Sequence, residues 1–190
     1  MKIFYWSPFI SKVATITAVI NSMISLSKYS KNKFEPQLIN VAGEWDAYEN
    51  DLYKENIKII NLTNFKFLKN RNYKGFLKSR FIYSLIFIIS FFPLRNLLKK
   101  DKPEYLIMHL ITLLLFILNS IFNFKTKFIL RISGYPQLEK NFVRFFFWKI
   151  FTRKLNYITC PTNDTLKNIK SFNFIDNSRI KAIYDPVLNL

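Results

Sequence analysis

The sequence predicts an α/β domain in three layers, with a mostly parallel sheet of about seven strands between two layers of helices. Several short runs of Ile, Leu, Phe and Val lack polar alternation, which is typical of strands that are buried on both faces. Longer segments with apolar residues at helical spacing alternate with these runs. With 190 residues, 50% of them hydrophobic, the chain is long enough to bury a core of its own.

Strands are expected wherever a short apolar run is bounded by turn-forming or charged residues. These runs lie at residues 2–6, 37–43, 57–62, 104–110, 127–133, 157–162 and 179–184. Gly43, Gly134 and Pro136 are such boundaries. The last expected strand is followed by Asp185 and Pro186, a pair that is typical of a turn.

Helices are expected in the longer segments between these strands. They lie at residues 13–29, 81–98, 111–122, 139–155 and 163–172. In the first of them, Ile16, Val19 and Met23 fall on one face at helical spacing. Asn163 and Asp164 are expected to cap the last helix, because their side chains can accept hydrogen bonds from the free amides of a first helical turn.

The formal net charge of +17 at pH 7 allows three kinds of partner: nucleic acid, an anionic membrane surface or a phosphorylated substrate. Lysine and asparagine are abundant throughout the chain, and the bias of an AT-rich genome would produce the same mixture without any function. The charge alone therefore selects no partner. The single cysteine, Cys160, excludes an intrachain disulfide and a cysteine-based metal site.

Two apolar stretches raise the alternative of a small integral membrane protein with a helical hairpin at residues 81–122. Residues 81–94 are shorter than the roughly 20 residues that a membrane span needs. Residues 105–122 approach that length, but they include His109 and other polar side chains that are unfavourable in lipid unless paired. A buried strand followed by a helix is the preferred interpretation of this second stretch.

Ligands of parallel sheets bind beyond the carboxyl ends of the strands, so the residues that follow each strand are candidate binding residues. After the first strand, small hydroxyls and a lysine lead into a helix: Ser7, Ser11, Lys12 and Thr15. A helix N-terminus with a nearby lysine can hold an anion, and the alternative is ordinary capping of the helix by Ser11. The segment has no glycine, which argues against the G-x-G-x-x-G loop of a dinucleotide site.

Two acidic residues and the only histidine follow other strands. Glu44 and Asp46 cluster after the second expected strand, where they either bind the hydroxyls of a sugar or belong to a solvated loop. His109 lies at the carboxyl end of the fourth expected strand and is the candidate general base. The alternative for His109 is a packed histidine with a satisfied hydrogen bond.

The fifth expected strand runs into RISGYP, which brings three further candidates to the same edge of the sheet. Arg131 can hold a phosphate through two parallel hydrogen bonds. The turn at Gly134 exposes Ser133 and Tyr135. No Ser-His-Asp order, P-loop, H-E-x-x-H motif or paired-carboxylate signature is present in the sequence. The chain is therefore either not an enzyme, or an enzyme whose chemistry needs groups from another domain.

The order and spacing of these pieces resemble the N-terminal half of a GT-B glycosyltransferase. The resemblance covers essentially the whole chain and rests on WSPFISKVATITAVINSMISLSKY, INVAGEWDAY, RISGYP, YITCPTNDTL and IKAIYDPV. It is strongest to family 4 enzymes that build bacterial surface polysaccharide and lipopolysaccharide. It implies a Rossmann-like N-terminal glycosyltransferase domain at residues 1–184. Asp185 and Pro186 would begin the interdomain hinge at residues 185–190, with the C-terminal donor domain absent.

The resemblance also implies an activity. It implies retaining transfer of a sugar from a nucleotide-sugar to a glycan or lipid-linked acceptor, with no metal or other cofactor, and no activity for this half alone. The residues expected to face the diphosphate of the donor are Ser7, Ser11, Lys12 and Thr15. Those expected to face the acceptor are Glu44, Asp46, Arg131, Ser133 and Tyr135, with His109 as the candidate catalytic residue. The first loop lacks the glycine that many relatives have.

A basic chain of this kind also suits the inner face of the plasma membrane. Anionic lipid attracts each nearby Lys or Arg by about 1 kcal/mol. The loop at residues 66–80 and the helix around residues 143–154 combine basic and aromatic residues, which is typical of helices that lie on a membrane. The alternative is that these aromatic residues form core. Since the apolar N-terminal run is too short for a signal peptide, the chain is expected to be cytoplasmic and peripheral.

A basic nucleic-acid-binding domain is the remaining alternative. Its lysines should cluster on one face, whereas this sequence distributes lysines along the whole chain. No nucleic-acid partner is therefore expected.

Overall fold

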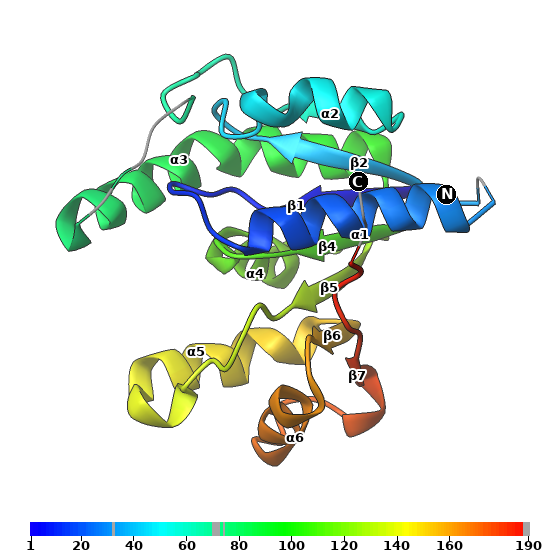
Figure 1. Cartoon of the computed structure of the whole chain (residues 1–190). Helices are drawn as coiled ribbons and strands as arrows, with labels where there is room; N and C mark the ends of the chain where they lie inside the picture. Colours follow the sequence, from blue (N-terminus) through cyan, green and yellow to red (C-terminus); the bar gives the residue numbers. More distant parts are fainter. Residues whose placement is uncertain (32, 70–72, 74, 188–190) are drawn as a thin grey trace.

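The computed structural model describes residues 1–31, 33–69, 73 and 75–187, and it has the predicted three-layer α/β fold (Figure 1). The seven strands are β1 (Lys2–Trp6), β2 (Glu35–Asn40), β3 (Lys58–Asn61), β4 (Tyr105–Met108), β5 (Lys127–Arg131), β6 (Tyr157–Cys160) and β7 (Ile180–Ala182). They form one sheet in the order β3-β2-β1-β4-β5-β6-β7, and every pair is parallel. The prediction of a mostly parallel sheet with about seven strands is confirmed.

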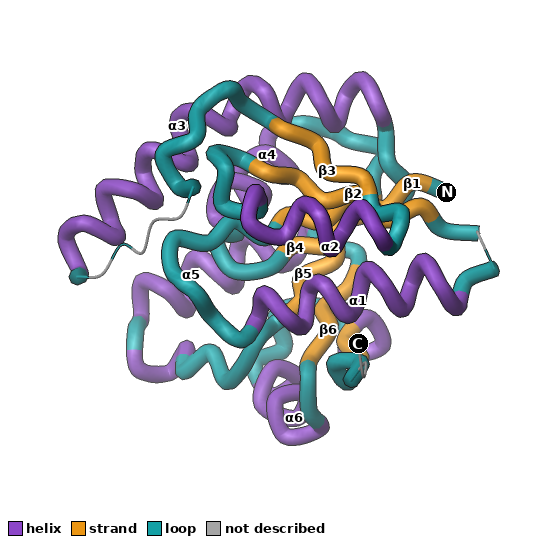
Figure 2. Tube along the Cα trace, turned by 45° about the horizontal axis from the view of Figure 1, so that its top comes forward, coloured by secondary structure: helices purple, strands orange, loops and turns teal. Residues whose placement is uncertain are grey.

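Helices cover both faces of this sheet (Figure 2). They are α1 (Thr15–Tyr29), α2 (Glu49–Lys54), α3 (Phe76–Asp101), α4 (Leu113–Ile121), α5 (Phe142–Phe151) and α6 (Asn163–Ser171). A hydrophobic cluster joins α1 and α2 to one face, and a larger cluster joins α3, α4 and α6 to the other. This arrangement follows from right-handed crossovers on a sheet whose strand order reverses once.

The order of the strands reverses at β1. This strand pairs with β2 on one side and with β4 on the other, so that Tyr5 lies opposite both Leu38 and Ile107. The chain leaves β1 towards α1 on one face and leaves β4 towards α4 on the opposite face. The two connections diverge, and the carboxyl ends of β1 and β4 are left at a topological switch point, where ligands of such sheets bind.

The long helix α3 packs on the sheet through a single stripe of residues. Ile82, Ile86, Leu94 and Leu98 are buried along this stripe, and each buried side chain of this size stabilises the fold by roughly 1.5–3 kcal/mol. By length and composition, α3 is the one helix of the described residues that is long and apolar enough to cross a membrane, and 28% of its most apolar stretch is buried.

The alternative of a helical hairpin at residues 81–122 is wrong for this structure. These residues include β4, which lies between β1 and β5 in the sheet, as well as most of α3 and all of α4. The preferred interpretation of residues 105–122, a strand followed by a helix, is confirmed.

Several element boundaries differ from the sequence predictions. Helix α2 has six residues and was not predicted. Residues 76–80 belong to α3 rather than to the basic loop, and positions 70–72 and 74 of that loop lie outside the described residues. The cap of α6 is Thr162, whose hydroxyl oxygen accepts a hydrogen bond from the Thr165 amide at 3.1 Å, and not Asn163 or Asp164. Strand β7 begins one residue later than predicted because Arg179 ends a 3₁₀ turn, and it ends at Ala182 rather than at Tyr184.

Candidate functional site

A small pocket lies at the switch point of the sheet. Its volume is about 100 Å³, several times the roughly 10–15 Å³ that one water molecule needs. It is lined by Ala14, Thr15, Ala18, His109, Arg131, Ser133 and Asp185. The fold thus brings together five residues that the sequence singled out on four separate segments, because the carboxyl ends of parallel strands meet at one edge.

His109 is the first residue after β4 and is 3% exposed. Its backbone amide donates to the Trp6 carbonyl oxygen at 2.8 Å, and its ring stacks on Tyr5 with 6.4 Å between ring centroids. Among the described residues, no group hydrogen-bonds to its Nδ1 atom. The alternative prediction, a packed histidine with its hydrogen bonds formed, is therefore wrong for the Nδ1 atom.

The environment of His109 keeps its ring neutral. Burial, with a smaller contribution from the charge of Arg131, lowers the pKa of His109 from 6.5 to about 3. A group with so low a pKa is a weak general base near pH 7, because efficient proton transfer needs a pKa close to the working pH. A neutral imidazole can still donate or accept a hydrogen bond, and this is the chemistry that the geometry offers a ligand.

Arg131 ends β5 beside His109 and is 8% exposed. One terminal nitrogen of its guanidinium donates to the Ile183 carbonyl oxygen, and the other donates to the Asp185 carboxylate. The guanidinium is thus held by the chain itself, and a phosphate would have to share or displace Asp185. The prediction that Arg131 binds a phosphate stays a prediction.

The C-terminal segment, residues 183–187, runs from the end of β7 back towards α1 (Figure 1). Besides the two contacts with Arg131, Asn21 on α1 donates to the Pro186 carbonyl oxygen at 3.0 Å, and Asn163 donates to the Tyr184 hydroxyl at 3.1 Å. Sequence reasoning missed Asn21. The sequence feature that could have identified it is an amide side chain on the side of a helix whose other buried residues are apolar.

The first loop contributes less to the pocket than the sequence suggested. Ser7 is fully buried, and its hydroxyl has no hydrogen-bond partner among the described residues. Ser11 lines a second pocket of about 60 Å³. Lys12 is exposed and lines neither pocket. Capping of α1 by Ser11 is wrong, because the N-cap is Ala14, which forms no side-chain cap hydrogen bond.

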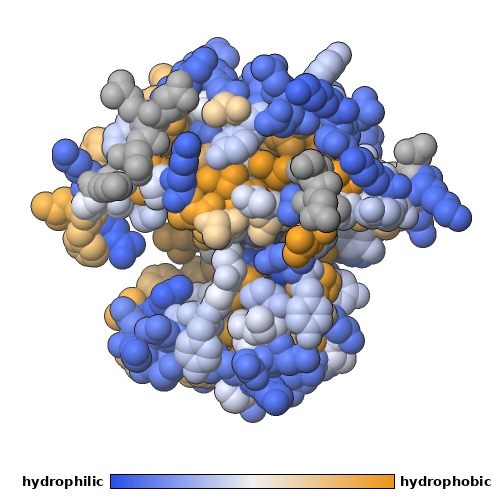
Figure 3. Space-filling model, in the orientation of Figure 1, coloured by the Kyte–Doolittle hydropathy of each residue, from blue (hydrophilic) through white to orange (hydrophobic). Residues whose placement is uncertain are grey.

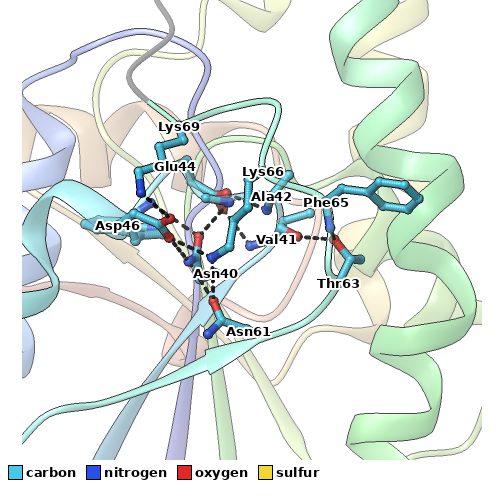
Figure 4. Close-up of polar contacts among 12 residues, drawn as sticks. Asn40, Val41, Ala42, Glu44, Asp46, Asn61, Thr63, Phe65, Lys66 and Lys69 are labelled. Carbon is cyan, nitrogen blue, oxygen red and sulfur yellow. Dashed lines mark hydrogen bonds and ion pairs between the residues drawn. The ribbon is translucent and has the colours of Figure 1, made fainter.

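Glu44 lies in the loop after β2 (Figure 4) and does not line the pocket. It is 4% exposed. Its two carboxylate oxygens accept hydrogen bonds from the backbone amides of Val41 at 2.9 Å and Ala42 at 2.8 Å. Burial raises the pKa of Glu44 from 4.5 to about 7. The interpretation of this residue as part of a solvated loop is wrong, and the carboxylate shapes the turn that follows β2.

Asp46 is held by a separate set of donors in the same loop (Figure 4). It accepts hydrogen bonds from Asn40 at 2.7 Å and Lys66 at 2.9 Å, and the Lys69 ammonium lies 3.8 Å away. Burial alone would raise the pKa of Asp46, but the hydrogen bonds from Lys66 and Asn40 outweigh it and hold that pKa below its usual value. Neither Glu44 nor Asp46 lines the pocket, and their role towards an acceptor stays a prediction.

This loop is organised by Asn40, which sequence reasoning did not single out, and by Gly43, which it treated only as a strand boundary. Asn40 accepts hydrogen bonds from the amides of Gly43 at 3.2 Å and Trp45 at 3.3 Å. Gly43 has φ of +88°, and a Cβ atom there would lie 3.0 Å from the Lys66 side chain and 3.2 Å from that of Lys69. The position therefore requires glycine on both conformational and steric grounds.

Ser133 is exposed at the rim of the pocket, whereas Tyr135 lies outside its lining. Tyr135 is 52% exposed, and its hydroxyl oxygen accepts a hydrogen bond from the Asn168 amide group at 2.6 Å.

In the part of the chain that the structure describes, no group of three or more His, Cys, Asp or Glu side chains can hold a metal ion.

Comparison with known proteins finds similarity in structure only. No protein-family model and no curated protein matches the sequence. Anabaena HepE, solved with UDP and glucose, has a TM-score of 0.61 at 11% identity, over 98% of this chain and 45% of that one. The lipopolysaccharide outer core galactosyltransferase WaaB has a TM-score of 0.58 at 14% identity, over 98% and 46%. The UDP-GlcNAc 2-epimerase from Neisseria meningitidis, bound to UDP-GlcNAc, has a TM-score of 0.60 at 14% identity, over 96% and 46%.

These similarities establish the fold. The chain has the Rossmann-like domain architecture of GT-B glycosyltransferase-like proteins, and this part of the predicted resemblance is confirmed. The chain spans less than half of the length of each of these structures.

Proposed function

We propose that this chain is the acceptor-side half of a retaining glycosyltransferase of family 4 type, which acts in the synthesis of bacterial surface polysaccharide. The pocket at the switch point between β1 and β4 is the observation that carries this proposal. It lies where α/β sheets bind ligands, on a fold shared with structures solved with UDP or UDP-sugars.

The size of the pocket supports an acceptor rather than a nucleotide. A volume of about 100 Å³ admits one or two hydroxyl-bearing groups of a sugar and is well below the roughly 300–1,000 Å³ of sites that enclose a whole ligand. In this proposal Thr15, His109 and Ser133 form hydrogen bonds with acceptor hydroxyls. The nucleotide-sugar is held mainly by a donor-binding half beyond residues 1–184, which the hinge at residues 185–190 connects.

The electrostatics of the pocket support a mechanism that needs no strong base from this half. His109 has a pKa of about 3 and Arg131 is paired with Asp185, so neither removes a proton from a hydroxyl near pH 7. In retaining transfer the phosphate of the donor itself takes the proton of the acceptor. No metal or other cofactor is part of the proposal, and the expected acceptor is a glycan carried on a lipid.

The test is sugar transfer by the product of the native gene, including any donor-binding half that it encodes. Purified protein is incubated with radiolabelled UDP-sugars and membranes of the source cells, and label in glycolipid is measured. Thr15→Val and Ser133→Ala should each lower kcat/KM roughly three- to tenfold, the usual effect of one lost hydrogen bond. Tyr53→Ser on α2, a residue that does not line the pocket and is 81% exposed, is the control.

Two results would overturn the proposal. The first is absence of transfer from every nucleotide-sugar tried, with the protein shown to be folded. The second is transfer at the wild-type rate by both pocket variants, which would separate the activity from the pocket. We expect residues 1–190 alone to transfer nothing.

A further inference from the structure

The outer sides of α3, α4 and α5 carry large apolar residues that no other part of the described chain covers. Helix α4 contacts both α3 and α5, so the three helices form one layer. Exposed residues of this kind include Phe81 (69%), Ile88 (68%) and Phe92 (67%) on α3, Ile121 (62%) on α4, and Phe142 (80%) and Phe146 (52%) on α5. We refer to the outer sides of α3, α4 and α5 as the outer face.

Helix α3 is apolar on two opposite sides. Its buried stripe faces the sheet, and Phe81, Ile88 and Phe92 lie on the opposite side of the helix at helical spacing. A helix at the surface of a soluble domain normally presents polar residues there. The beginning of α3 protrudes from the body of the molecule, with apolar residues beside hydrophilic ones (Figures 1 and 3).

Helix α5 repeats this pattern over ten residues, none of which is buried. Phe145 packs inward, at 5.1 Å between ring centroids from Phe174. Phe142 and Phe146 lie one turn apart on the outward side. The prediction that the aromatic residues of this helix are core is therefore right for its inward side only.

The charged residues of the same three helices are nearly all positive. Residues 66–100, 105–138 and 140–163 contain no Asp or Glu. Helix α3 instead carries Arg95 and Lys99, α5 carries Lys149, and the 3₁₀ turn that follows α5, η3 (Thr152–Lys154), carries Arg153. Five of the twelve acidic residues lie at residues 44–55, on the other side of the sheet with η1 (Asp46–Tyr48) and α2. The apolar outer face is thus bordered by cations and matches an anionic partner.

We infer that the outer face docks onto an anionic membrane surface, with α3 and α5 parallel to the plane of the lipid headgroups. Aromatic and aliphatic side chains insert among the acyl chains while Lys and Arg reach the headgroups, as in interfacial helices. Nucleic acid would pair with the cations but would leave the phenylalanines in water. The inference is independent of the proposed function.

The packing supports docking rather than crossing. The buried stripe of α3 is committed to the sheet, so this helix cannot enter lipid on all sides while the domain stays folded. Helix α5 has ten residues and is about 15 Å long, half of the roughly 30 Å that a span covers. Both helices therefore have one side available to lipid and one side held by protein.

The test is flotation of the 190-residue chain with phosphatidylcholine vesicles, prepared with and without phosphatidylglycerol. We expect flotation with anionic vesicles only, and loss of binding in about 1 M salt, where electrostatic attraction reaches only about 3 Å. Lys149→Gln with Arg153→Gln should weaken partitioning roughly fivefold for each cation removed. Phe142→Ser with Phe146→Ser should abolish stable binding.

Matched controls lie on the opposite side of the sheet. Tyr29 on α1 and Tyr53 on α2 are 75% and 81% exposed, so Tyr29→Ser with Tyr53→Ser removes comparable apolar surface there. Circular dichroism confirms that each variant is folded. The inference is overturned if the wild-type chain does not float, or if the Phe142 and Phe146 variant floats as well as the control.

Two further outcomes would identify a different occupant. Retention in vesicles after alkaline carbonate would show that α3 inserts across the membrane, and docking would be wrong. Failure to float, together with self-association that Phe142→Ser and Phe146→Ser abolish in sedimentation velocity, would assign the outer face to a second copy of this chain.

Discussion

Replacement of His109 by glutamine should remove a large acid-dependent loss of stability. His109 is 3% exposed, and its Nδ1 atom has no hydrogen-bond partner among the described residues. Protonation of such a ring places a charge in a buried site beside the Arg131 cation. Glutamine has a similar polar reach and cannot take up a proton, so it removes the titration while leaving the site polar.

The magnitude follows from the pKa of His109 in the folded and unfolded chains. Burial lowers that pKa from 6.5 to about 3. Between these values the unfolded chain binds a proton that the folded chain does not, so the stability of the wild type falls as the pH drops below 6.5. At about pH 4.5 the loss amounts to about 3 kcal/mol.

Urea denaturation of wild type and His109→Gln at about pH 7.5 and about pH 4.5 measures this effect. The difference in unfolding free energy between the two proteins should shift by about 3 kcal/mol in favour of the variant at the lower pH. A difference that stays constant between the two pH values would refute the reasoning, because a constant effect reports packing and not titration.

A second readout uses the fact that the chain has one histidine. The Cε1 proton signal of His109 in the NMR spectrum should not titrate between about pH 8 and 5. Tyr29→His adds an exposed reporter, which should titrate near pH 6.5 in the same sample. A His109 signal that titrates together with the reporter would contradict the buried, neutral ring.

Three further substitutions test other parts of the structure, each by urea denaturation. Burial raises the pKa of Glu44 from 4.5 to about 7, so wild-type stability should fall by about 3 kcal/mol relative to Glu44→Gln as the pH rises across that range. Asp185→Asn should destabilise by about 1 kcal/mol, because the carboxylate is 45% exposed, and the effect should largely vanish in an Arg131→Met background. Leu94→Ala should destabilise by about 2–5 kcal/mol, whereas Ile88→Ala, on the exposed side of α3, should change stability by less than about 0.5 kcal/mol.

Each of these predictions can fail separately. An unchanged pH profile in Glu44→Gln would show that the two backbone amides keep the carboxylate ionised at every pH tested. Additive effects of the Arg131 and Asp185 substitutions would show that the ion pair contributes nothing measurable. Equal effects of the Leu94 and Ile88 substitutions would contradict the orientation of α3 on the sheet.

Most of the fold was predictable because strands buried on both faces leave a strong sequence pattern. The strand β1 was placed at its observed bounds from five residues, KIFYW. Helix α2 was missed because six residues make fewer than two turns, and an apolar period cannot show over that length. The start of α3 was placed too late because its first turn, like the loop before it, is rich in basic residues.

The residues of the site were predictable where the topology of the sheet alone brings them together. The carboxyl ends of parallel strands share one edge, so Thr15, His109 and Arg131 meet although up to 116 positions separate them in the chain (131 − 15 = 116). The pairing of Arg131 with Asp185 was not predictable, since it depends on the path of the C-terminal segment. The burial of Glu44 was also missed. An acidic residue between Gly and Trp gives no indication in the sequence that two backbone amides will donate hydrogen bonds to it.

The central proposal is that this chain is one half of a two-domain nucleotide-sugar enzyme. The coding sequence downstream of the Leu190 codon in the native gene tests this claim most directly. We expect the reading frame to stay open for about 150 codons and to encode a second alternation of strands and helices. A stop codon directly after Leu190, with no neighbouring gene for such a domain, would contradict the claim.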